Sequence, residues 1–338
     1  MTAVFLEGVH KVVQDEMPIP QPGPRDVLVK MKAVGVCGSD THYYEHGRIG
    51  DFVIREPLIL GHECAGEVVE VGPDVTTLEP GDRVALEPGI PCRHCALCLS
   101  GRYNLCQDVV FMGTPPHHGA FREYVTSPED FAYRLPKGVS VEVGATVEPL
   151  AVGMHACTMV GVKPGESVAV LGAGPIGLLA VSAASAAGAA HITAVDMVPM
   201  RLEFAGKMGA DRTVDAGQTD VSKELENSAD VVLDCAGVEQ TLSESLKVAR
   251  PGGRVGWIGM ASDTATVPLI EAQSKELSIV TVFRYANVYG RAVSLLASGK
   301  IDTEPLITHK FGFPEVEKAL KFASENKEIA LKTMVVFD

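Results

Sequence analysis

The sequence predicts a two-domain α/β protein, with a β-rich first half and a doubly wound parallel sheet in the second. Up to about Pro136, short runs of alternating polar and apolar residues are separated by Gly and Pro, which indicates antiparallel strands. After about Glu148, nearly continuous apolar runs alternate with helical stretches, which favours a parallel sheet covered on both faces. A length of 338 residues also favours two domains, since one domain takes roughly 150.

The elements follow in order. We expect strands of the first half at 26–34, 67–71, 82–86 and 121–125. In the second half we expect strands at 167–171, 191–195, 230–233, 254–258 and 277–282, with helices that include 176–187 and 239–249. Residues 314–327 are typical of a helix, and 331–337 of a short amphipathic strand that packs back onto the first domain.

Composition and charge exclude several classes of protein. Lys and Arg number 29 against 43 Asp and Glu, so the net charge of −14 opposes contact with a nucleic-acid backbone. Eight cysteines are too few for a disulfide scaffold, and no secretory signal opens the sequence, so we expect a cytoplasmic protein. Residues 167–195 contain no Lys, Arg, Asp or Glu, but five Gly and Pro residues divide them, so we expect no membrane span.

A glycine turn opens the second half. Gly172-Ala-Gly174-Pro-Ile-Gly177 follows a predicted strand and begins a predicted helix, a spacing that lets the backbone approach a pyrophosphate. Asp196 closes the next strand, where a carboxylate can bind both hydroxyls of an adenosine ribose and repel a 2′-phosphate. The pattern predicts a dinucleotide site that prefers NAD to NADP, although the nearby Arg201 could receive a phosphate.

Four cysteines crowd into one short loop. Cys92, Cys95, Cys98 and Cys106 are separated by two, two and seven residues, and thiolates on such turns can close a tetrahedron around zinc. His94 lies inside the run, but four sulfur ligands already complete that shell. The spacing alone does not distinguish zinc from an iron–sulfur cluster. The loop therefore predicts a structural metal site and favours zinc.

Cys37, His62 and Glu63 form a second set of candidate metal ligands. Cys37 lies where we expect a strand to end, and the other two are in Gly61-His62-Glu63. Each residue alone is better explained by packing or by solvation, so the set gains its meaning from the rest of the chain.

Together these motifs resemble the zinc-dependent medium-chain alcohol dehydrogenases, and within them the sorbitol (L-iditol) and xylitol dehydrogenase branch. Further matching segments are 42–50, 114–116, 148–157 and 282–285, and the likeness runs through the chain in order. It implies a GroES-like catalytic domain at 1–149 and 289–338, which carries the structural zinc loop 92–106. It also implies a Rossmann domain that binds NAD at 150–288.

The resemblance implies roles for individual residues. Cys37, His62 and Glu63 would be the catalytic zinc ligands, with Asp40 orienting the imidazole and Ser39 and His42 relaying a proton. Glu148 would hold the zinc-bound water or substrate, or coordinate at times. The implied substrate residues are Tyr43, Phe111, Thr114, Glu148, Arg284 and Tyr285. The implied cofactor contacts are Gly172, Gly174, Ile176, Gly177, Asp196, Arg201, Ile258, Gly259, Met260, Val282, Phe283 and Arg284.

The implied reaction is oxidation of a secondary hydroxyl of a sugar alcohol to a 2-ketose, with hydride transfer to NAD in a cleft between the domains. Zinc with an open coordination position stabilises the alkoxide that must form first. Two zinc ions per subunit and a homotetramer, or a dimer, are also implied. Because several sorbitol dehydrogenases lack the four-Cys site, its presence leans toward bacterial or fungal polyol enzymes.

Two other functions remain open at this point. One is a threonine-type amino-alcohol dehydrogenase with the same zinc and cofactor architecture. The other is a non-catalytic redox sensor that binds NAD(H) and a structural zinc. A zinc-ribbon nucleic-acid binder is disfavoured by the acidic charge of the chain.

Overall fold

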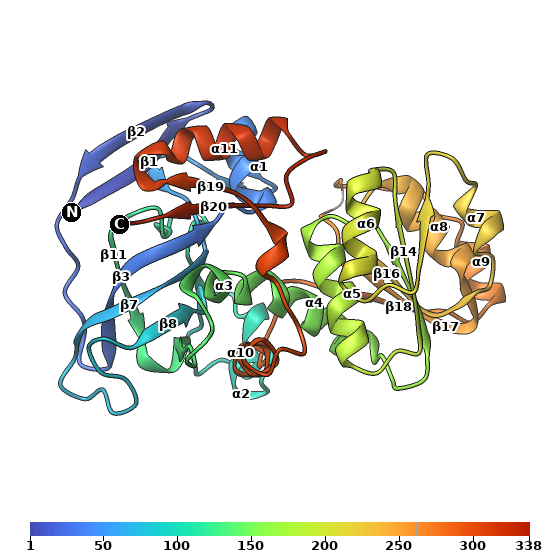
Figure 1. The fold of residues 1–338 in the computed structure, drawn as a ribbon, viewed down its shortest axis with the longest axis horizontal. Helices are drawn as coiled ribbons and strands as arrows, with labels where there is room; N and C mark the ends of the chain where they lie inside the picture. The colour runs from blue at the N-terminus through green and yellow to red at the C-terminus, as the bar shows by residue number, and fades with distance from the viewer. Residues whose placement is uncertain (261) are drawn as a thin grey trace. The chain divides into compact units, whose positions relative to one another are not determined.

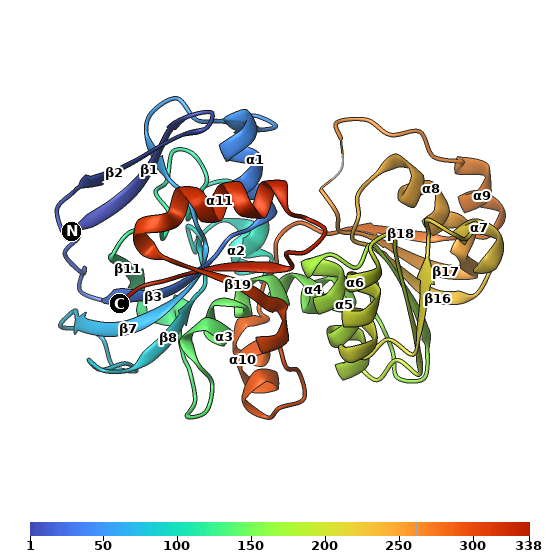
Figure 2. The ribbon, with the colours of Figure 1, turned by 45° about the horizontal axis from the view of Figure 1, so that its top comes forward.

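The structure, a computed structural model, describes residues 1–260 and 262–338 and divides the chain into two units (Figures 1 and 2). Unit 1 comprises Met1–Glu148, Tyr289–Gly299 and Thr303–Asp338, and unit 2 comprises Pro149–Val288 and Lys300–Asp302. Each unit is organised by its own sheet.

Strand β3 (Asp26–Gly35) is the centre of unit 1, because it pairs antiparallel with β7 (Glu63–Val71), β11 (Tyr124–Pro128) and β20 (Lys332–Val336). The C-terminal strand thus completes the first sheet, as the sequence predicts. The seven-stranded sheet has the order β12-β8-β7-β3-β20-β19, with β11 on β3. The other strands of unit 1 are β1 (Thr2–Gly8), β2 (Lys11–Glu16), β4 (Arg48–Ile49), β5 (Phe52–Val53), β6 (Leu58–Ile59), β8 (Arg83–Leu86), β9 (Gly89–Ile90), β10 (Val110–Phe111), β12 (Ala132–Arg134) and β19 (Ile307–Gly312).

Helix α11 (Val316–Glu325) packs on β19, β20 and α1, and Figure 2 shows it lying along β19. It does so because Val316, Ala319 and Leu320 share one helical face and are buried. The other helices of unit 1 are α1 (Gly38–His46), α2 (Ala96–Leu99), α3 (Val141–Ala145), α10 (Tyr289–Ala297) and the 3-10 turns η1 (Tyr103–Leu105), η2 (Glu129–Phe131), η3 (Glu304–Leu306) and η4 (Phe313–Glu315). Helix α4 (Val147–Val160) begins in unit 1 and continues in unit 2.

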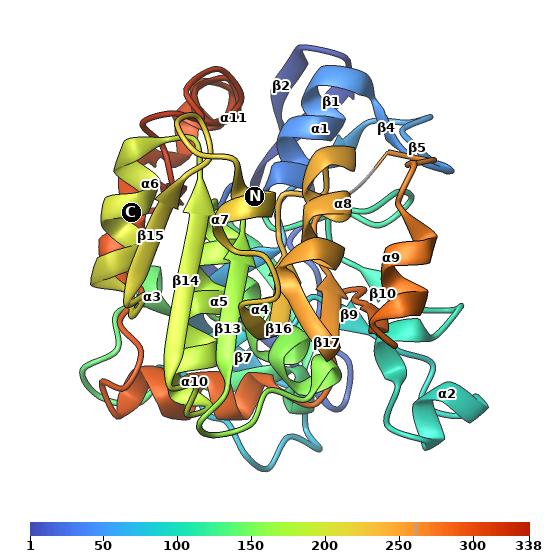
Figure 3. The same cartoon turned by 90° about the vertical axis from the view of Figure 1, so that its right-hand side faces the viewer.

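Unit 2 contains a six-stranded sheet in which every pair of neighbouring strands is parallel (Figure 3). The order β15-β14-β13-β16-β17-β18 reverses direction at β13, so right-handed crossovers place the helices of the two halves on opposite faces. This confirms the doubly wound sheet. Its strands are β13 (Ser167–Leu171), β14 (His191–Asp196), β15 (Arg212–Asp215), β16 (Ala229–Asp234), β17 (Ala249–Trp257) and β18 (Ser278–Thr281); its helices are α5 (Pro175–Ala186), α6 (Pro199–Lys207), α7 (Val221–Glu224), α8 (Glu239–Val248) and α9 (Leu269–Ser274).

The uncharged segment 167–195 is divided into strand, turn, helix and strand, as predicted. None of the helices in the described residues combines the length and the hydropathy that a membrane span needs.

Two local predictions are wrong. Strand β3 ends at Gly35, and Cys37 is instead the N-cap of α1, a helix that its polar sequence does not reveal. The run 121–125 becomes a regular strand only from Tyr124. The reason is that the residues before it bond to a different strand: the amide of Val4 donates to the carbonyl of Phe121, and Arg122 bridges to Ala3 of β1.

Candidate active site

Cys37, His62 and Glu63 converge in unit 1 although they are far apart in the sequence. The Sγ of Cys37, one imidazole nitrogen of His62 and one carboxylate oxygen of Glu63 all lie within 4.8 Å of one another. Glu63 is the first residue of β7, and Cys37 caps the N-terminus of α1, so the register of β3 on β7 brings them together. His62 and Glu63 are buried.

Asp40 ties the two segments that supply these donors. One of its carboxylate oxygens accepts from the amide of Cys37 (2.9 Å), and the other accepts from the amide of Gly61 (3.0 Å). The Nδ1 of His62 lies 3.7 Å from that second oxygen. The carboxylate therefore links the backbone at Cys37 to the backbone beside His62, and it lies where a residue behind a metal ligand would lie.

Lys332 of β20 is a member of this site that sequence reasoning missed. Its Nζ donates to both carboxylate oxygens of Glu63, at 2.7 and 2.6 Å, and to the carbonyl of Val36 at 3.2 Å. Both side chains are almost completely buried. The signal in the sequence is weak, since one Lys in an amphipathic strand is typical of a solvent-facing position.

The charges of this group fit a bound cation. Burial alone would lower the pKa of His62, but Asp40, Cys37 and Glu148 outweigh it and raise that pKa well above its ordinary value. Burial would also lower the pKa of Lys332, yet Glu63, Cys37 and Glu148 raise it. The acidic groups around this site therefore favour positive charge there, and a thiol, an imidazole and a carboxylate are donor types that zinc accepts.

Several other predicted residues of unit 1 lie near these donors. The ring centroid of Phe111 is 5.6 Å from that of His62, and the turn that follows Phe111 packs closely on Gly61. Thr114 belongs to this turn, because its amide donates to the carbonyl of Phe111. Ser39, His42 and Tyr43 lie on α1, and Glu148 begins α4 as a buried carboxylate.

The four cysteines of the 92–106 loop also converge. Their sulfur atoms lie within 4.8 Å of one another, with Cys95 and Cys98 3.4 Å apart. Backbone amides of the loop donate to these sulfurs, and two such bonds lower the pKa of Cys92 to about 6, which favours the thiolate. The Nδ1 of His94 instead bonds to the carbonyl of Cys92. The arrangement fits a metal held by four sulfurs.

In unit 2 the glycine turn has the predicted geometry. Gly172 has a φ of +89°, and Gly174 is the N-cap of α5. A Cβ at Gly177 would lie 1.8 Å from the carbonyl oxygen of Gly172, so glycine is required for the helix to pack on the turn. Ile176 lies in the first turn of α5, whose N-terminus can receive a phosphate.

Asp196 ends β14 beside the glycine turn. Its carboxylate accepts from the amides of Ala173 (2.7 Å) and Val198 (2.9 Å), and Arg201 lies 3.5 Å from it. The other predicted cofactor contacts of unit 2 follow β17 and β18. Ile258, Gly259 and Met260 come after β17, and Val282, Phe283 and Arg284 come after β18, with the guanidinium of Arg284 4.8 Å from the ring centroid of Phe283. Tyr285 is buried.

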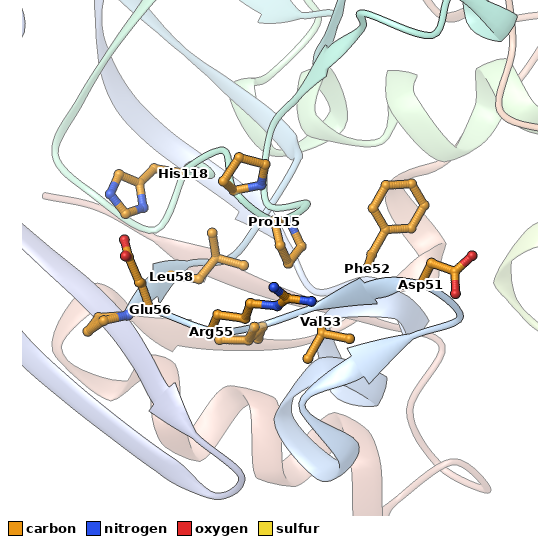
Figure 4. A pocket seen from close by; sticks show the side chains of 11 residues that line it. Asp51, Phe52, Val53, Arg55, Glu56, Leu58, Pro115 and His118 are labelled. Carbon is orange, nitrogen blue, oxygen red and sulfur yellow. The ribbon is translucent and has the colours of Figure 1, made fainter.

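Each unit contains a pocket. In unit 2, a cavity of about 350 Å³ is lined by ten residues that include Gly259 and Val282. In unit 1, a cavity of about 480 Å³ lies between the 51–58 segment and the loop that carries Pro115, Pro116 and His118 (Figure 4). The predicted substrate residues do not line this second pocket, although it adjoins Thr114 in the sequence.

Family models match both units of the chain. One described as "Alcohol dehydrogenase GroES-like domain" covers residues 23–137, and one described as "Zinc-binding dehydrogenase" covers 175–298. The chain therefore belongs to the zinc-binding alcohol dehydrogenase family. It is an oxidoreductase that acts on a CH–OH group, and its cofactors are zinc and NAD.

Relatives and solved structures narrow the position within this family. The chain is 46% identical to sorbitol dehydrogenase of Arabidopsis thaliana, over 98% of this chain and 94% of the relative. It is 45% identical to a protein of Aspergillus clavatus named "Probable D-xylulose reductase A", over 98% and 95%. The crystal structure of L-idonate 5-dehydrogenase from Escherichia coli matches with a TM-score of 0.94 and 34% identity, over 99% of this chain and 98% of that one.

Proposed function

We propose that the chain is a zinc- and NAD-dependent polyol dehydrogenase that oxidises a secondary hydroxyl of a sugar alcohol, such as sorbitol, L-iditol or xylitol, to the 2-ketose. The convergence of Cys37 with the buried His62 and Glu63 carries the proposal. The names of the relatives, sorbitol dehydrogenase and D-xylulose reductase, support the substrate class.

Cys37, His62 and Glu63 would hold the catalytic zinc, because three protein donors leave a position for water or a substrate oxygen. When bound, zinc supplies Lewis acidity at the substrate oxygen, and NAD supplies the hydride acceptor. Glu148 acts electrostatically on His62 and would hold the water or a substrate hydroxyl there, or coordinate directly. Lys332 would compensate the charge of Glu63 and keep its carboxylate in place.

Ser39 and His42 would carry the proton released by the substrate hydroxyl. They are three residues apart on α1, so they share one helical face. The Nδ1 of His42 lies 2.8 Å from the carbonyl oxygen of Arg48, which only an N–H can satisfy. That bond leaves Nε2 as the proton acceptor, with half-exposed His42 delivering the proton to solvent.

The substrate would lie among polar and aromatic side chains. We propose Tyr43, Phe111, Thr114, Glu148, Arg284 and Tyr285 as the residues that contact it. A chain of hydroxyls needs directional partners, and a pocket built of such partners rejects analogues that lack them.

Gly172, Gly174, Ile176 and Gly177 would receive the pyrophosphate of NAD. Asp196 would accept from the adenosine ribose, since each carboxylate oxygen can accept more than the one backbone bond it has here. Arg201 would be a further cofactor contact here, because its guanidinium lies 3.5 Å from the carboxylate of Asp196. We place further cofactor contacts at Ile258, Gly259, Met260, Val282, Phe283 and Arg284.

The four-Cys loop would hold a second, structural zinc, giving about two per subunit. We further propose that 1–149 with 289–338 is the catalytic domain, and that 150–288 is the NAD-binding domain. We keep the prediction of a homotetramer, with a dimer as the smaller alternative. The cytoplasmic location also stays a prediction. The open edge of β18 supports association between subunits, as do the exposed apolar side chains of Leu269, Ile270 and Ile279 in the same unit.

A substrate panel tests the proposal. Reduction rates of NAD and NADP are measured with sorbitol, xylitol, arabinitol, galactitol, threonine and ethanol, together with zinc per chain. We expect polyols and NAD to give the highest rates. Turnover of threonine alone would establish the amino-alcohol enzyme, and NADH binding without turnover and with about one zinc would establish a redox sensor.

A further inference from the structure

Asp234 is a buried carboxylate that the proposed reaction leaves without a role. It ends β16, in register with Leu171 of β13 and Trp257 of β17, and its exposed fraction is 0%. It therefore lies at the carboxyl edge of the sheet, at the point where the strand order reverses. Ligands of doubly wound sheets bind outside this edge.

The carboxylate of Asp234 organises the turn that follows it. One oxygen accepts from the amides of Ala236 (3.2 Å) and Gly237 (3.4 Å), and the other accepts from the amide of Gly237 (3.3 Å). The hydroxyl of Thr241 is a further partner. Burial raises the pKa of Asp234, and these donors oppose that shift. These bonds fix the tight turn that follows β16.

Three glycine segments meet at this turn with their backbones in contact. A Cβ at Gly172 would lie 2.8 Å from the amide nitrogen of Ala236, and a Cβ at Gly259 would lie 2.3 Å from that of Gly237. Gly237 itself has a φ of +69°. The carbonyl of Asp234 also accepts from the amides of Ile258 and Gly259. The 235–237 turn is thus the spacer between the pyrophosphate turn and the 258–260 segment.

We infer that Asp234 is a positioning residue for the nicotinamide half of the dinucleotide. It fixes the 235–237 turn, and the turn sets the distance between Gly172 and Gly259. In the proposed site the adenosine half would lie on the other side of the reversal point, where Asp196 ends β14. Loss of the Asp234 carboxylate should therefore weaken binding of the nicotinamide half and leave binding of the adenosine half intact.

The inference rests on the proposed NAD site, and the test separates the two. Dissociation constants for NADH and for AMP are measured by calorimetry on the zinc-loaded wild type and on Asp234→Asn. Asn keeps one acceptor oxygen but replaces the other, which accepts from the amide of Gly237, with an NH2 group that cannot accept. We therefore expect NADH to bind about tenfold more weakly and AMP within about twofold of wild type. No NADH binding by the wild type would contradict the proposed function. Unchanged NADH binding by the variant, or an equal loss for AMP, would overturn the inference.

Asp230→Asn is the matched control, because Asp230 is a carboxylate near the opposite end of the same strand. It accepts from the amide and hydroxyl of Ser167 and from Arg250. We expect it to lower the melting temperature without changing the ratio of the NADH and AMP constants.

Gly237→Ala disturbs the contact between the 235–237 turn and the 258–260 segment but keeps the Asp234 carboxylate. It replaces Asp234→Asn if that variant does not fold. A Cβ at Gly237 would lie 2.6 Å from the carbonyl carbon of Gly259, so the two segments must separate. NADH binding should weaken while AMP binding stays. Wild-type NADH affinity in this variant would overturn the inference.

Discussion

The two groups of metal donors in unit 1 are built in different ways. The four-Cys loop draws all its donors from residues 92–106, and the amides that bond to its sulfurs belong to the same loop. The other group takes Cys37 from the N-cap of α1 and His62 and Glu63 from the start of β7. Asp40 in the first turn of α1 and Lys332 in the distant strand β20 hold these donors in place.

This difference shows what each group depends on. The loop is self-contained, whereas the dispersed group depends on the register of three strands. Gly35 of β3 pairs with both Glu63 of β7 and Met334 of β20. A Cβ at Gly35 would lie 2.2 Å from a carboxylate oxygen of Glu63, so this glycine makes room for the carboxylate. A closed site stabilises its own loop, and an incomplete donor set must be held open by the fold around it.

The largest contrast should come from removing one donor of each group. We expect Cys37→Ser to reduce kcat for polyol oxidation by about 10³-fold and to lower zinc from about two to about one per chain, because the Lewis acid is lost. Cys98→Ser should also lose one zinc but keep kcat within about threefold, with faster inactivation on heating. Steady-state rates and elemental analysis of both variants are the measurements. If Cys98→Ser lost activity as completely as Cys37→Ser, the two groups would not differ in the way proposed.

The second prediction concerns the buried partner of Glu63. Without zinc, Lys332→Met should lower the free energy of unfolding by about 3–5 kcal/mol, because it leaves a buried carboxylate with no compensating cation. Zinc should reduce this loss, since the metal takes over the compensation. Denaturant unfolding with chelator and with zinc measures both values.

Lys310→Met is its matched control. Lys310 pairs in register with Met334 on the neighbouring strand, and its salt bridge to Glu142 is largely exposed. We expect a loss of about 0–1 kcal/mol there. If Lys332→Met lowered the free energy of unfolding by no more than this control, the buried carboxylate of Glu63 would not depend on Lys332 for its stability.

The same contrast explains what the sequence could predict. The spacing of Cys92 to Cys106 and the glycine turn at Gly172 are local, so turn geometry alone links them to a chemistry. The parallel sheet is also readable, because its buried strands are continuous apolar runs. Cys37, His62 and Glu63 could be grouped only through resemblance to a family, since nothing local to either segment brings them together.

The residues that were missed depend on pairings between distant segments. Lys332 in a terminal strand has the pattern of a solvent-facing residue, and only the pairing of β20 with β3 brings it to Glu63. Asp234 resembles any strand-ending Asp until the glycine segments around it are known. Cys37 was placed on a strand because α1 has no apolar stripe that marks a helix.

The last prediction concerns Glu87, which bonds to the four-Cys loop and should make stability depend on pH. Glu87 directly follows β8, and its carboxylate is buried. It accepts from the hydroxyl of Tyr103 in the four-Cys loop (2.6 Å) and from that of Tyr133 (3.0 Å). Burial raises the pKa of Glu87 to about 7, against the two phenol bonds that lower it. The folded chain therefore binds a proton more tightly than the unfolded chain, so this group loses stability as the pH rises from about 4.5 to about 7.

Glu87→Gln should remove that loss. Relative to wild type, its free energy of unfolding should increase by about 2–3 kcal/mol between pH 5 and pH 8, measured by denaturant titration at each pH. A constant difference over this range would mean that Glu87 does not titrate there.

Glu129→Gln should respond in the opposite direction and so serves as the control. Its carboxylate is buried as well, but it accepts from the amides of Thr76 and Thr77, from the Thr77 hydroxyl and from Arg25. These bonds lower the pKa of Glu129 to about 2, so its contribution to stability is present at neutral pH and is lost as the pH falls from about 4.5 toward 2. The variant should be less stable than wild type at pH 7, and the difference should shrink below pH 4. Since both carboxylates are buried, opposite pH responses would show that the number and charge of the donors decide the sign.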